Sequence, residues 1–94
     1  MEQTVRENTK RHRKSLIGML EPRFELLGML YARDVLHDDE FEILNNLVTT
    51  HDRNSLIVDI VVNRCGAGCE KFMESLAESE QSHVASYIRH DGSQ

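Results

Sequence analysis

Residues 69–77 read CEKFMESLA and contain the clearest helical signal in the chain. Their apolar residues stand at positions i, i+3, i+4, i+7 and i+8, namely Cys69, Phe72, Met73, Leu76 and Ala77. An α-helix turns once every 3.6 residues, so this spacing places all five side chains on one face. The segment therefore predicts an amphipathic helix that packs one face against a core.

The preceding apolar run, LIVDIVV at 56–62, is rich in β-branched residues and would suit a buried strand as well as a helix. A single strand among helices would leave its backbone groups unpaired, at about 1–3 kcal/mol for each buried group. We therefore expect a helix here, with Thr49, Thr50 or Asp52 as its N-terminal cap. Asp59 inside the run is expected to point outward or to pair with a base.

The first half of the chain predicts three helices. Residues 4–20 carry apolar side chains at spacings of three or four, which indicates a first helix. Proline fits the first turn of a helix, so a second helix is expected from Pro22 to about Ala32, with Tyr31 facing the core. Asp38 can cap a third helix that runs through Val48.

Beyond residues 69–77, Ser79 can cap a short last helix whose residues Val84, Ala85 and Ile88 face inward. Residues 89–94 are expected to form a frayed tail. The sequence thus predicts an all-α bundle of six short helices in a single domain of residues 1–94, with its core at about 5–88.

Length and composition are consistent with one small domain, since the chain has 94 residues of which 39% are hydrophobic. No apolar run approaches the roughly 20 residues that cross a bilayer, and the N-terminal segment lacks the apolar centre of a secretory signal. We therefore expect a cytoplasmic protein without a membrane partner. Two cysteines alone are fewer than small secreted domains use, so Cys65 and Cys69 are expected to be reduced thiols.

The sequence gives little support to catalysis or metal binding. It contains no G-x-S-x-G motif, no phosphate-binding glycine loop and no H-E-x-x-H pair, so we expect neither an enzyme nor a cofactor. Cys65 and Cys69 with His51 and His83 could in principle bind zinc, but their spacing departs from the usual zinc pattern. Core thiols are the preferred interpretation.

Charge is distributed unevenly along the chain, although the net charge is −5. Residues 1–20 carry five bases against two acids, and residues 34–42 carry five acids and no lysine or arginine. Two surfaces of opposite sign are therefore predicted, which points to a protein partner. Three alternatives remain open: a merely solvated helix face, a nucleic-acid patch at KRHRK (10–14), and acids that only complement a helix N-terminus.

Taken together, the order of these segments resembles a caspase recruitment domain of the death-fold superfamily. The resemblance rests on KRHRK (10–14) before Leu16, LGMLYARDVL (27–36), DEFEIL (39–44), LIVD (56–59), FMESL (72–76) and QSHVA (81–85). It covers about residues 5–88, which is nearly the whole chain.

The resemblance implies a six-helix antiparallel Greek-key bundle that binds another domain of the same kind through oppositely charged surfaces. The basic face would consist of Lys10, Arg11, Arg13, Lys14 and Arg53. The acidic face would consist of Asp34, Asp38, Asp39, Glu40 and Glu42.

The expected function is a homotypic interaction module that recruits or assembles an initiator caspase, a scaffold or an inflammasome-type complex in apoptosis or innate immunity. The partner would be another protein with a caspase recruitment domain, and self-association into an oligomer or filament is expected from the two faces. Two alternatives remain: a decoy that inhibits such assemblies and, more distantly, a helical regulator that binds nucleic acid. An acidic chain without aromatic residues among its bases argues against nucleic acid.

Overall fold

The computed structural model describes residues 2–22, 24–64 and 67–91, apart from the side chains of residues 2–4, 24, 67 and 68. These residues form seven α-helices and no strand, as the sequence predicted for the fold class. The helices are α1 (Glu2–Arg11), α2 (Arg13–Met19), α3 (Phe24–Ala32), α4 (Asp38–Asn46), α5 (Thr50–Asn63), α6 (Ala67–Glu78) and α7 (Ser82–Arg89). No described helix is long and apolar enough to span a membrane.

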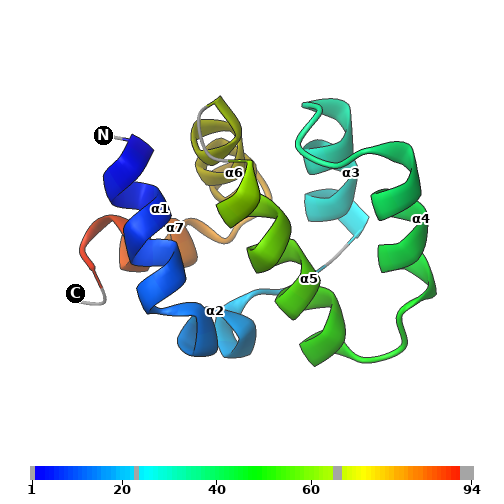
Figure 1. Cartoon of the computed structure of the whole chain (residues 1–94), viewed down its shortest axis with the longest axis horizontal. Coiled ribbons are helices and arrows are strands. Elements are labelled where there is room, and N and C mark those ends of the chain that lie inside the picture. Colours follow the sequence, from blue (N-terminus) through cyan, green and yellow to red (C-terminus); the bar gives the residue numbers. More distant parts are fainter. Residues whose placement is uncertain (1, 23, 65–66, 92–94) are drawn as a thin grey trace.

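Helix α5 occupies the middle of the bundle and packs against α1, α2 and α6 (Figure 1). This is the segment whose sequence suited a strand or a helix, and the helical prediction is confirmed. Thr49 caps it by accepting a hydrogen bond from the backbone N–H of Asp52, as expected for one of the candidate caps. Ile57, Val58 and Val61 are buried on its inner side, while Asp59 is exposed and pairs with a base.

The seventh helix arises because the first predicted helix is interrupted at His12, where the backbone angles are φ −104° and ψ 24°. Backbone hydrogen bonds continue across this point, from His12 N–H to Asn8 O and from Leu16 N–H to His12 O. The chain therefore bends without losing its hydrogen bonds. The bend lets α1 pack against α7 while α2 packs against α5 (Figure 1).

Two predicted caps are wrong. Asp38 is the first residue of α4, and the cap is His37, whose backbone N–H donates to the Glu40 carboxylate. Ser79 does not cap α7, which begins three residues later after Gln81. The Ser79 hydroxyl is buried and donates a hydrogen bond to the backbone oxygen of Leu76, in the last turn of α6.

The predicted core is largely confirmed, with Phe72, Leu76, Val84 and Ile88 fully buried. Tyr31 was expected to face the core, but it is 40% exposed. Its ring stacks on Phe41 of α4 with the ring centroids 4.7 Å apart, so it contributes to the contact between α3 and α4.

The cysteine prediction is wrong for Cys69, which is disulfide-bonded and fully buried at the start of α6. Cys65, the other cysteine of the sequence, lies outside the described residues. The interpretation of both cysteines as reduced thiols is therefore withdrawn.

Two buried amide side chains hold the connection between α2 and α3. Gln81 accepts a hydrogen bond from the backbone N–H of Glu21 (2.9 Å) and donates one to its backbone oxygen (2.8 Å). Asn54 donates to the last carbonyls of α2, those of Ile17 (2.7 Å) and Leu20 (2.8 Å). The backbone groups of Glu21 and the carbonyls of Ile17 and Leu20 thus have hydrogen-bond partners from side chains that are themselves buried.

Helix α4, which carries most of the acidic face, packs chiefly against α3 and is tied to the end of α5 by Arg64. The two terminal nitrogens of this guanidinium donate to the two carboxylate oxygens of Glu40, at 2.5 and 2.6 Å. Arg64 also donates to the backbone oxygen of Val35, at 2.9 Å. One arginine therefore fixes the α3–α4 connection and the first turn of α4 together.

Replacing Phe72 with alanine should lower the free energy of unfolding by about 3–5 kcal/mol, because the ring is fully buried among core residues. Chemical denaturation followed by circular dichroism measures this change. Small domains are only about 5–15 kcal/mol stable, so partial unfolding of the variant at room temperature would also agree with this prediction. A variant with the same free energy of unfolding as the wild type would contradict the position of Phe72 in the core.

Replacing Glu40 with glutamine should lower the free energy of unfolding by about 1.5–3 kcal/mol at neutral pH, the usual contribution of hydrogen bonds to a charged group. Hydrogen bonds from Arg64 are the main reason that the pKa of Glu40 is lowered from its ordinary value of 4.5. The folded state thus binds this proton less readily than the unfolded state. The stabilisation is complete above about pH 4.5 and is lost as the pH falls through the lower pKa of the folded state.

Urea denaturation over an acidic pH series measures this effect. The variant should lose less stability than the wild type as the pH falls below 4.5. Glu42→Gln is the matched control, since it removes the same charge from α4 but has no side-chain partner among the described residues. Equal pH profiles for the wild type and Glu40→Gln would contradict the role assigned to the pair.

Candidate functional site

The basic face is built around the bend between α1 and α2. Lys10 and Arg11 end α1, Arg13 and Lys14 begin α2, and all four side chains are exposed. Arg53 lies on α5, which packs against α2. It is half-buried, and its Nε donates to the backbone oxygen of Leu47 at 2.9 Å, so it also secures the α4–α5 connection.

Arg13 is held by two residues of α5. Its Nε and Nη2 donate to the two carboxylate oxygens of Asp59 at 2.9 and 3.2 Å, and Nη2 also donates to the Ser55 hydroxyl at 2.6 Å. The hydrogen bond to Asp59 is the main reason that the pKa of Arg13 is raised. Both side chains remain about half exposed, so solvent limits the strength of this pair.

Arg11 is held by Asp91, which follows the last helix. Nη1 of Arg11 lies 2.7 Å from both oxygens of the Asp91 carboxylate. His12 Nε2 lies 2.8 Å from one of them, and the His12 ring meets Tyr87 edge to face. Hydrogen bonding to His12, followed by that to Arg11, lowers the pKa of Asp91. The Asp91 carboxylate thus links the turn after α7 to the bend between α1 and α2.

Lys10 and Lys14 differ from these arginines because neither makes a hydrogen bond or ion pair to another residue that the structure describes. Their ammonium groups are exposed. Within the basic face they are the charges available to a partner without breaking an internal contact.

The acidic face divides in the same way. Glu40 faces Arg64 and Asp38 accepts a hydrogen bond from the Tyr31 hydroxyl at 2.5 Å, so both have internal partners. The carboxylates of Asp34, Asp39 and Glu42 are exposed and accept no hydrogen bond from the described residues. These three carboxylates lie around the α3–α4 connection and along α4.

An open cleft of about 480 Å³ lies between the end of α3 and the start of α4. Its walls combine two carboxylates, an aromatic ring and aliphatic groups, and the lining residues are Tyr31, Ala32, Asp34, Leu36, His37 and Asp38. Asp34 is held at φ 64°, in the left-handed region that aspartate tolerates better than most residues. A hollow of this composition suits a lysine or arginine side chain, which can meet both the carboxylates and the ring face.

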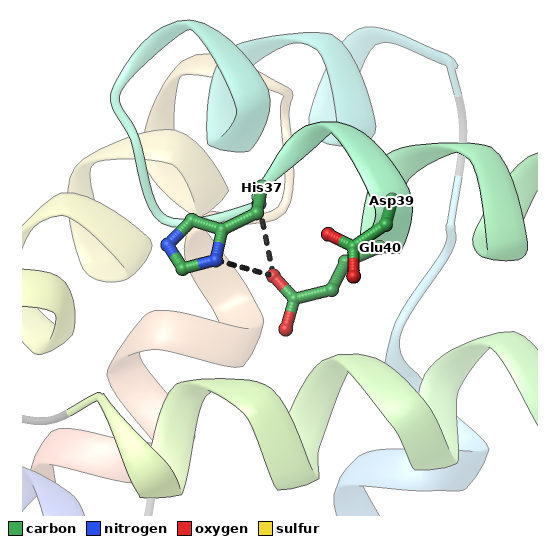
Figure 2. Close-up of side chains that lie close together, drawn as sticks. All are labelled: His37, Asp39 and Glu40. Atoms are coloured by element: carbon green, nitrogen blue, oxygen red, sulfur yellow. Dashed lines mark hydrogen bonds and ion pairs between the residues drawn. The ribbon is translucent and has the colours of Figure 1, made fainter.

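His37, Asp39 and Glu40 lie close enough together to suggest a metal site, with one ligand atom of each within 4.8 Å of the others (Figure 2). Arg64 argues against this use, because its guanidinium contacts both Glu40 oxygens and lies 3.2 Å from His37 Nδ1. The position of a cation is already taken by the arginine. The sequence alternative of a zinc site also fails at Cys69, whose sulfur is in a disulfide, while Cys65 lies outside the described residues.

Sequence reasoning assigned the charged faces but missed their internal partners. Asp91, Asp59 and Arg64 each neutralise a residue that was assigned to partner binding. The partners are 80, 46 and 24 positions apart in the chain. The expectation that Asp59 either points outward or pairs with a base was the one available signal, and it is confirmed.

Comparison with protein families gives an independent result. The chain matches the caspase recruitment domain over residues 6–91. Comparison with curated proteins and with solved structures found no match. The family match spans all seven helices apart from the first residues of α1, and it agrees with the all-α fold. The chain therefore belongs to the caspase recruitment domain family, whose members are protein-interaction domains.

Proposed function

We propose that this chain is a single, non-enzymatic domain that binds another caspase recruitment domain through its two charged faces. In this proposal α1 and α2 are two halves of one bent first helix, which gives the six-helix Greek-key arrangement expected for the family. The assembly would recruit an initiator caspase, a scaffold or an inflammasome-type complex in the cytoplasm, in apoptosis or innate immunity. The observation that carries the proposal is the separation of lysines from carboxylates that likewise have no partner among the described residues.

Most of the two faces lie apart along the molecule. α1 is at one end of its longest dimension and α4 is at the other, with α2 and α5 between them (Figure 1). This dimension is 33 Å. Arg53 is the exception, because it lies at the α4–α5 connection. A domain with complementary faces at opposite ends makes head-to-tail contacts, and such contacts close into a ring or continue as a filament. This supports self-association as well as binding to a different member of the family.

Several charge pairs must act together in such a contact, because one exposed ion pair contributes only about 0–1 kcal/mol. Their larger effects are on orientation, on the choice of partner and on the rate of association. Lys10 and Lys14 meeting two of the three unpaired carboxylates, Asp34, Asp39 and Glu42, would supply attraction of this kind. The α3–α4 cleft would add an apolar contact for the stem of a lysine.

Nucleic acid is the weaker alternative on this geometry. Binding to nucleic acid relies on bases that neutralise phosphates, whereas here Asp91 and Asp59 already pair with Arg11 and Arg13. A decoy is the nearer alternative, since it would use one face and block propagation. Oligomerisation of the isolated chain distinguishes a nucleator from a decoy.

The double substitution Lys10→Glu with Lys14→Glu should weaken self-association or partner binding by roughly tenfold or more, because it replaces attraction by repulsion at two sites. The fold should be unchanged, since neither lysine has an internal partner among the described residues. Sedimentation velocity over a salt series measures the association. Lys71→Glu on α6 is the matched control for the single reversal Lys10→Glu, and an equal loss with Lys71→Glu would contradict the assignment of the basic face.

Mixing two inactive variants tests the head-to-tail geometry. Asp39→Lys with Glu42→Lys should abolish self-association, as should the double lysine variant, because each lacks one functional face. An equimolar mixture should form dimers that do not grow, since one intact basic face meets one intact acidic face. Negative-stain microscopy and light scattering measure the products. Filaments from either variant alone would rule out this contact.

A further inference from the structure

Two arginines of the basic face form ion pairs with carboxylates of the same chain. Asp91 binds Arg11 at 2.7 Å, and Asp59 binds Arg13 at 2.9 Å. A partner that presents carboxylates to this face therefore meets guanidinium groups whose charge is already neutralised. The unpaired Lys10 and Lys14 lie beside them in the sequence.

The two internal pairs differ in geometry. Arg13 donates to Asp59 through Nε and Nη2, which is the parallel two-bond arrangement that arginine forms best with a carboxylate. Arg11 donates to Asp91 through Nη1 alone, and this nitrogen is shared between both oxygens. Nε and Nη2 of Arg11 make no hydrogen bond to the described residues. Asp91 also lies 2.8 Å from His12 Nε2, a contact that does not engage Arg11. Of the two arginines, Arg11 is therefore the one whose guanidinium still has donors for a better-placed carboxylate.

Exposure and backbone conformation support this difference. The Arg11 and Asp91 side chains are 57% and 49% exposed, so a second carboxylate can approach the pair from solvent. Asp91 is held at φ 53°, a left-handed conformation that carries a cost for a residue other than glycine.

We infer that Asp91 is a built-in competitor for Arg11, and that a partner binds the basic face by replacing the Asp91 carboxylate with one of its own. The inference rests on the proposed role of the basic face in partner binding. It makes Asp91 a specificity determinant, because a partner gains Arg11 only if its carboxylate can take two parallel hydrogen bonds. A partner that offers an amide or a single oxygen leaves Asp91 in place.

The competition can be measured without a natural partner by titrating hexaglutamate and following the backbone amide resonances of α1 and α2. Asp91→Asn removes the competing charge and keeps the side-chain shape, and asparagine also tolerates left-handed backbone. Hexaglutamate should bind this variant about two- to fivefold more tightly than the wild type, as expected for removal of one exposed ion pair. Equal or weaker binding would overturn the inference.

Two controls separate competition from other effects. Glu74→Gln removes one negative charge from the exposed side of α6, so an equal gain there would show a net-charge effect and overturn the inference. In an Arg11→Gln background, Asp91→Asn should give no gain, because the contested group is absent. A gain that persists in this background would also overturn it.

A third variant guards against misfolding. If Asp91→Asn does not fold, Asp91→Gly releases the same contact and suits a residue at φ 53°. Failure of the inference and failure of the proposed function give different results. Loss of association in the double lysine variant together with unchanged hexaglutamate binding in Asp91→Asn would overturn only the competitor role. A wild type that binds neither itself nor any other caspase recruitment domain, together with tighter hexaglutamate binding in Asp91→Asn, would overturn only the proposed function.

Discussion

The fold depends on how the chain crosses from α2 to α3. This connection passes between the half of the bundle that carries the basic face and the half that carries the acidic face (Figure 1). Gln81 pairs with both backbone groups of Glu21, and Asn54 closes the C-terminal end of α2. Both side chains are fully buried. The Asn54 hydrogen bonds are buried too, so each lost one would leave a carbonyl of α2 unpaired at about 1–3 kcal/mol.

Some charged residues in this domain hold helices together through internal ion pairs, and others are exposed to solvent. The sequence alone does not distinguish the two groups. Glu40 and Glu42 stand two positions apart on α4, yet Glu40 turns toward Arg64 and holds the helix, whereas Glu42 faces solvent. The same division separates Arg11 and Arg13 from Lys10 and Lys14. It also agrees with the chemistry of the two side chains, because arginine forms fixed multiple hydrogen bonds and lysine acts as a mobile point charge.

The sequence predicted those features that depend on neighbours within one helix. The spacing of Phe72, Met73 and Leu76 was sufficient for α6, and local chemistry limited the cap of α5 to three candidates, of which Thr49 is the cap. The sequence did not predict the position of the bend at His12 or the Asp91 contact, since His12 and Asp91 are brought together only by the packed bundle. The cap at His37 was missed although its contact with Glu40 is local, because Asp38 was preferred as the cap. The blocks of like charge in the sequence predicted two faces of opposite sign. Which of these charges are already paired within the chain could be seen only in the three-dimensional structure.

The internal pairs also bear on how a head-to-tail domain avoids premature assembly. A domain with two complementary faces propagates at any concentration above the dissociation constant of one contact. Free lysines raise the rate of encounter through long-range attraction, while contacts that form after docking mainly set the rate of dissociation. In the proposed assembly Lys10 and Lys14 supply the first effect and Arg11 supplies the second, after Asp91 leaves it. Retaining Asp91 therefore weakens the contact between isolated molecules, which raises the concentration at which the proposed assembly grows.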